Sequence, residues 1–125
     1  MKLMPQEIEV RYILPAIRKQ LTIALAKNGL KQNQIAKLLN ITPAAVSQYT
    51  KEKRGTTSFP KIVQKEINNS TKLILENKST PHKELYKISN LIKETATICD
   101  IHRLYDNVPK TCEVCFPKWK LLKIQ

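Results

Sequence analysis

The sequence predicts an all-α protein. Glycine occurs only 2 times in 125 residues, whereas Lys, Gln, Leu and Ile are frequent. Runs of β-branched residues are short. Apolar residues recur every three or four positions in several stretches, as they do on the buried face of a helix. We therefore expect a bundle of helices.

The N-terminal quarter predicts a brief helix and then a longer one. Pro5 can open a helix through Ile8, with acidic residues at its positive end. Pro15 disfavours helical geometry at the residue before it, so we expect the chain to restart or kink there. Apolar positions then recur as far as Asn28-Gly29, a typical helix end, which predicts a helix over about 15–28.

The stretch 32–51 predicts two short helices joined by a tight turn. Apolar residues within 35–39 form a stripe at helical spacing. Asn40 tolerates the left-handed backbone conformation that ends a helix. Thr42 is a favoured residue before a helix, and Pro43 suits the first helical position.

The second of these helices, residues 43–52, has one apolar and one polar face. Ala45, Val46 and Tyr49 are expected to point inward. The residues expected to contact DNA from the other face and the helix ends are Thr42, Pro43, Ala44, Ser47, Gln48, Lys51, Lys53 and Arg54. Gln48 is the best candidate to read a base, because Gln can pair bidentately with adenine in the major groove.

This pattern resembles the helix-turn-helix of the phage-repressor-like (Xre) regulators. The resemblance implies that Gln32 touches a backbone phosphate and that Ala36 lets the two helices cross closely. It also implies that Val46 anchors the recognition helix. The family usually has glycine in the turn, where this chain has Asn40. The alternative to DNA binding is an ordinary helical hairpin in a bundle core.

The segment EVRYILPAIRKQL (9–21), with the helix-turn-helix and KRG at 53–55, is similar to an archaeal group of Xre-type regulators with a short cysteine-bearing C-terminal part. The similarity is close over most of residues 4–55 and looser at the cysteines. Many of these relatives read L-P-C-E where this chain reads M-P-Q-E at 4–7. Any metal or redox role of that extra cysteine is therefore absent here.

The second half predicts two further helices, over about 60–77 and 81–102. The first is expected to point Ile62, Val63, Ile67 and Ile74 inward. The second carries an apolar stripe from Leu85 to His102. We expect residues 1–58 to form the DNA-binding domain, and residues 59–125 a helical region that dimerises through Ile92 to Ile98 and Trp119 to Leu122.

The three cysteines and one histidine follow the pattern C-x2-H-x9-C-x2-C: Cys99, His102, Cys112 and Cys115. Residues three apart on a helix are close enough to share one metal ion. Three thiolates and an imidazole form an ordinary structural zinc site, a small metal-binding knuckle. An iron–sulfur cluster, with His102 in place of one thiolate, and a site without metal are the alternatives. The other histidine, His82, is expected to be a surface or capping residue.

The net charge of +12, from 22 basic and 10 acidic side chains, suits a polyanionic partner. No apolar run approaches the roughly 20 residues that cross a bilayer, so we expect a soluble, cytoplasmic protein. No Gly-rich phosphate loop, H-E-x-x-H or G-x-S-x-G motif occurs, so we do not expect an enzyme. The favoured function is a homodimeric transcriptional regulator that binds double-stranded DNA. A protein-interaction adaptor and an RNA-binding factor are the alternatives.

Overall fold

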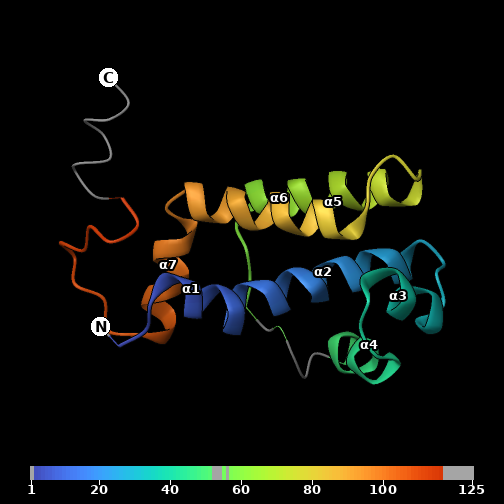
Figure 1. The fold of residues 1–125 in the computed structure, drawn as a ribbon, viewed down its shortest axis with the longest axis horizontal. Helices are drawn as coiled ribbons and strands as arrows, with labels where there is room; N and C mark the ends of the chain where they lie inside the picture. The colour runs from blue at the N-terminus through green and yellow to red at the C-terminus, as the bar shows by residue number, and fades with distance from the viewer. Residues whose placement is uncertain (1, 52–54, 56, 117–125) are drawn as a thin grey trace.

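A computed structural model of the chain describes residues 2–51, 55 and 57–116. All regular elements within these ranges are helical, and no strand occurs among them. The all-α prediction is therefore confirmed. Figure 1 shows the helices arranged around one long N-terminal helix.

The long helix has three consecutive parts. They are α1 (Pro5–Ile8), the π-helical segment η1 (Glu9–Ile13) and α2 (Leu14–Lys27). The α-helix restarts at this point, as predicted: α2 begins at Leu14 with Pro15 in its first turn, while the chain stays helical through η1. At the end of η1 the Leu14 N–H bonds to the Glu9 carbonyl, five residues back. This wider turn comes directly before Pro15, which has no N–H to donate, and accommodates it without breaking the helix.

One face of the long helix supplies much of the core. Its members are all exposed by 1% or less: Ile8, Ile13, Ala16, Ile17, Leu21 and Leu25. Helices α3 (Gln32–Leu39) and α4 (Pro43–Thr50) pack against α2 from one side. Helices α5 (Lys61–Leu75) and α6 (Pro81–Glu94) pair with each other and cover it from the other side (Figure 1).

Helix α5 corresponds to the helix predicted over 60–77. Val63, Ile67 and Ile74 are buried in it, as expected, but Ile62 is 57% exposed, so its predicted inward orientation is wrong. The three buried residues are spaced by four and seven positions and share one face. Ile62 precedes Val63 by one residue, or about 100° around the helix, and lies outside that face.

The single helix predicted over 81–102 is two helices, α6 and α7 (Thr97–Tyr105). Thr95 lies between them in an extended conformation, with φ −116° and ψ 166°. Its hydroxyl donates to the Leu91 carbonyl at 2.9 Å and lies 3.0 Å from the Thr97 hydroxyl. Such side-chain bonds compete with the helical backbone pattern and explain the break.

Residues from both predicted parts, 1–58 and 59–125, contribute to one hydrophobic core. The division into two domains stays a prediction. Ile92 and Ile98 are buried in this core, whereas Glu94 and Ala96 between them are exposed. The expected self-contact through Ile92 to Ile98 stays a prediction. The other expected self-contact, Trp119 to Leu122, lies outside the described residues. Across the described ranges, the helices are too short or too polar for any of them to cross a lipid bilayer.

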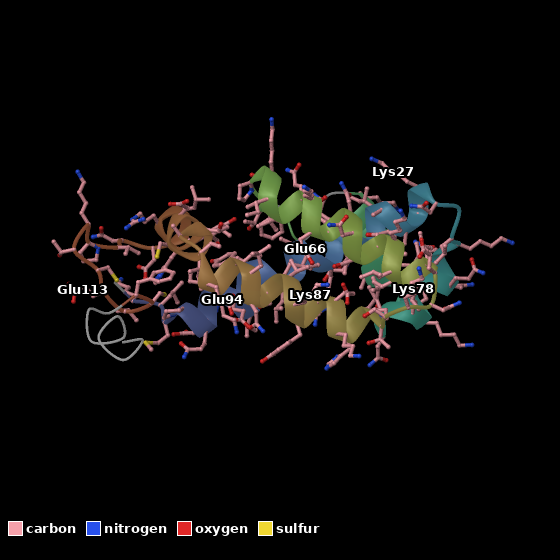
Figure 2. The ribbon with its side chains drawn as sticks, turned by 90° about the horizontal axis from the view of Figure 1, so that it is seen from above. Lys27, Glu66, Lys78, Lys87, Glu94 and Glu113 are labelled. Atoms are coloured by element: carbon pink, nitrogen blue, oxygen red, sulfur yellow. The ribbon has the colours of Figure 1, made fainter. Side chains whose placement is uncertain are left out.

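A charged network joins α5 to α6. Glu84 is only 4% exposed; it accepts a hydrogen bond from Ser79 at 2.6 Å and pairs with Lys87 at 3.1 Å. Lys87 also reaches Glu66 on α5, at 3.3 Å, as Figure 2 shows from above. Burial raises the pKa of Glu84, but its hydrogen bonds, those with Ser79 and Lys87 among them, outweigh burial and hold that pKa below its usual value.

We expect Glu84→Gln to lower the free energy of unfolding at pH 7 by about 1–2 kcal/mol, because it removes a buried, hydrogen-bonded charge. The pKa of Glu84 is lower in the folded chain than in the unfolded one. Its stabilising contribution is therefore complete above the usual carboxyl pKa of about 4 and is lost as the pH falls below it. Urea unfolding at pH 7 and pH 3 should show the difference between variant and wild type shrinking at pH 3.

The matched control is Glu94→Gln, on the same helix but exposed. It should change the unfolding free energy by less than about 0.5 kcal/mol. Equal losses in the two variants would contradict a specific role for the buried carboxylate.

Candidate nucleic-acid interface and cysteine cluster

The turn between α3 and α4 has the conformation that the sequence predicts. Asn40 ends α3 in the left-handed region, with φ 56° and ψ 47°. The Ile41 N–H then bonds to the Ala36 carbonyl at 2.9 Å, closing the end of α3. The Thr42 hydroxyl accepts the Ala45 N–H at 3.0 Å, and Pro43 is the first residue of α4. Both caps are confirmed.

Helix α4 has a buried and an exposed face. Ala45, Val46 and Tyr49 are exposed by 8%, 1% and 2%, as the sequence predicts. The candidate DNA-contacting residues on and beside α4 are exposed or half-buried: Thr42, Pro43, Ala44, Ser47, Gln48 and Lys51. Gln32, at the start of α3, is also exposed. Lys53 and Arg54 lie outside the described residues.

The chain around these helices carries no negative side chain over a long stretch. No Asp or Glu occurs between Glu9 and Glu52. The basic residues in the same stretch are Arg11, Arg18, Lys19, Lys27, Lys31, Lys37 and Lys51. A segment with this charge distribution attracts phosphate over a wide area of its surface. The net charge of the whole chain does not reveal that basic residues occur here without acidic ones.

Gly55 fixes the path of the chain after α4. Its φ is +61°, and a Cβ at this position would lie 2.4 Å from the Pro15 carbonyl oxygen. Only glycine permits so close a backbone approach in this conformation. Gly55 therefore lies directly against Pro15 at the start of α2. The sequence predicts only a loop at this point.

Cys99 lies on α7, which packs against α1, and Cys112 and Cys115 lie in the segment after α7. All three are half-buried and none forms a disulfide, and Cys99 and Cys115 pack against the core. Burial raises the pKa of the Cys99 thiol, whereas the nearby Arg103 guanidinium and a hydrogen bond with Cys115 act to lower it. The charge of a Cys112 thiolate also affects Cys99. Cys99 therefore lies within hydrogen-bonding reach of Cys115, and we refer to the three thiols together as the cysteine cluster.

His102 lies beside this cluster but has a different partner. It is 3% exposed, and its Nε2 lies 3.1 Å from Oδ2 of Asp106. Asp106 also accepts the backbone N–H groups of Lys2 and Leu3, each at 2.9 Å. The Leu3 amide does most to hold the pKa of Asp106 well below its usual range.

Among the described residues, no three His, Cys, Asp or Glu side chains are arranged to hold a metal ion. The ligand set Cys99, His102, Cys112 and Cys115 therefore stays a prediction. His102 on α7 and Asp106 directly after it are four residues apart, and this spacing could have indicated their contact. The contact of Asp106 with the first residues of the chain had no such signal.

Tyr105 links α7 to the segment that follows α4. Its hydroxyl lies 2.7 Å from the Thr57 hydroxyl, and Thr57 is 5% exposed. Its ring stacks on Tyr12 of η1, with centroids 3.7 Å apart and planes 5° apart. The helix that carries Cys99 and His102 thus contacts the chain that leaves the candidate recognition helix.

No protein-family model matches this chain, and neither a curated protein nor a solved structure shows significant similarity to it.

We expect Tyr105→Phe to lower the free energy of unfolding by about 1 kcal/mol, because the half-buried hydroxyl pair with Thr57 is lost while the ring stack remains. Urea denaturation measures this loss. Tyr86→Phe is the matched control, since Tyr86 is 68% exposed on α6. If both variants unfold at the same urea concentration as the wild type, the Thr57–Tyr105 bond does not stabilise the fold.

Proposed function

We propose that the protein is a sequence-specific DNA-binding transcriptional regulator whose helix α4 enters the major groove. The observation that carries the proposal is the exposed face of α4, which presents Pro43, Ala44 and Gln48 while the opposite face is buried. A helix presented in this way fits the roughly 12 Å width of the major groove. Gln48 then reads a base edge, and Ala44 can contact a thymine methyl group.

The charge distribution supports this proposal. Lys31, Lys37 and Lys51 are exposed on or next to α3 and α4, and no carboxylate occurs in this part of the sequence. Each phosphate that these residues neutralise releases condensed counterions, which favours binding and makes it depend on salt. These contacts position the protein, whereas contacts with the bases give specificity. One helix-turn-helix reads a half-site, so we propose a homodimer on a two-fold operator.

We also propose that Cys99, His102, Cys112 and Cys115 bind a metal, with zinc favoured over an iron–sulfur cluster. The three half-buried thiols supply the donor type of a structural zinc site, and Cys115 hydrogen-bonds to Cys99. His102 bonds through Nε2 to Asp106, and a metal-ligating histidine commonly holds a carboxylate with its second ring nitrogen. Nδ1 of His102 would then be the ligating atom. A metal held there stabilises the segment after α7, which has no helix of its own among the described residues.

The DNA-binding proposal predicts two kinds of mutant. On an operator selected from random DNA, Gln48→Ala should weaken binding by about 1–3 kcal/mol and relax one base position. Lys51→Ala should weaken binding to all DNA sequences similarly and reduce the salt dependence. Lys65→Ala removes the same charge from α5, which lies across α2 from α4 (Figure 1), and should have a much smaller effect.

Fluorescence anisotropy with the operator, a scrambled duplex and RNA of the same sequence separates the outcomes. Unchanged affinity and site preference in Gln48→Ala would reject this register for α4. Equal or tighter binding of the RNA would favour an RNA-binding factor. Failure to select any nucleic acid would leave the interaction adaptor.

The metal proposal is tested by Cys112→Ser with Cys115→Ser, purified anaerobically beside the wild type. We expect the wild type to carry stoichiometric metal and the double variant to lose it, because two of four ligands are gone. Elemental analysis and the absorption spectrum distinguish zinc from a cluster. Metal-free wild-type protein rejects the site, and full retention in the variant excludes both cysteines as ligands.

A further inference from the structure

A cavity of about 250 Å³ lies behind the turn between α3 and α4. It is enclosed by the middle of α2, by residues 38–41 and by the start of α6. Apolar side chains form much of its wall, among them Leu21, Leu39 and Leu85. Leu38 at its edge is 38% exposed, so the cavity is reached from solvent.

The polar part of the wall contains one cationic side chain, that of Arg18. Arg18 of α2 and His82 of α6 both line the cavity, and no Asp or Glu does. Arg18 is half-buried, and no carboxylate among the described residues pairs with it. A guanidinium group binds a carboxylate through two parallel hydrogen bonds, which makes it selective for planar anions. The imidazole of His82 supplies a further N–H donor.

We propose that this cavity binds a small organic carboxylate with an apolar body, held at its charged end by Arg18. The leucine walls favour an apolar group over an inorganic anion, which would have to lose its hydration against hydrocarbon. A buried apolar cavity of about 150 Å³ is enough to hold benzene, whereas drug-sized ligands need about 300 Å³ or more. The volume here suits an aromatic ring or a short alkyl chain that carries one carboxylate.

A ligand in this cavity would contact the turn between the candidate DNA-binding helices α3 and α4. An effect of the ligand on DNA binding rests on the proposed function. One wall is the turn that joins α3 to α4, and the opposite wall is α6. A bound carboxylate also neutralises Arg18 within the long stretch that has no acidic residue. Because DNA binding depends on that positive charge, we expect an occupied cavity to weaken it.

The test uses benzoate, with benzamide and acetate as comparison compounds at constant ionic strength. NMR titration of the full chain should show benzoate shifting the amide signals of Leu39, Asn40 and Leu85. Benzamide lacks the charge and acetate lacks the ring, so each should bind about tenfold more weakly. In Arg18→Gln the advantage of benzoate over benzamide should disappear.

Two further variants keep this test specific. Arg11→Gln removes an exposed arginine from the same long helix, outside the cavity, and should keep the wild-type preference. Leu38→Glu places a negative charge at the edge of the cavity and should weaken benzoate about tenfold while sparing benzamide. Shifts that map outside the cavity, or an unchanged preference in Arg18→Gln, overturn the proposal.

The regulatory part is measured separately, with the operator duplex. Saturating benzoate should weaken operator binding by the wild type about fivefold, and operator should weaken benzoate by the same factor. Arg18→Gln should not respond. If benzoate occupies the cavity but does not change the affinity for the operator, the coupling is rejected and the binding site is retained. Absence of any DNA binding rejects the proposed function and leaves the cavity titration valid.

Discussion

One face of the helix that runs from Pro5 to Lys27 loses nearly all of its contact with water, and every other helix is arranged to cover it. Burying an Ile or Leu side chain contributes roughly 1.5–3 kcal/mol, so this row of residues supplies a large share of the stability. Helices α3, α4, α5 and α6 all contact α2, and α7 contacts α1. A change in that face therefore affects the orientation of both candidate sites at once.

The cysteine cluster and the cavity belong to different parts of the molecule: α7 lies beside α1, whereas α3 and α4 lie at the far end of α2 (Figure 1). The cysteines are beside α1, and the cavity lies between α2, α6 and the α3–α4 turn. Tyr105 connects them in part, because its hydroxyl joins α7 to Thr57. Gly55, two residues before Thr57, lies against Pro15 of α2. The metal proposed for the cysteine cluster would therefore also restrict the chain at Gly55 and Thr57. Three contacts connect the two sites: the hydrogen bond between Tyr105 and Thr57, the ring stack of Tyr105 on Tyr12, and the backbone contact of Gly55 with Pro15.

Local features of the fold were predictable from the sequence, and distant contacts were not. Asn40, Thr42 and the inner face of α4 depend on neighbours within one or two helical turns, so spacing and capping preferences identified them. The π-helical turn before Pro15 was not predicted, and the break at Thr95 was missed because side-chain hydrogen bonding competes with the helix there. The contact of Tyr105 with Thr57 and the place of Arg18 in a cavity wall depend on how helices pack, which no periodicity in the sequence encodes.

The bonds from Asp106 to the backbone of Lys2 and Leu3 span 104 and 103 residues of chain. During synthesis the N-terminal segment is made 103–104 residues before the carboxylate that holds it. Throughout that interval α1 lacks α7, the helix against which it packs. Contacts so distant along the chain also form late in refolding, because the entropy cost of closing a long loop comes before the contacts can stabilise the fold. The long helix reaches its final packing only when the chain has been made beyond residue 106.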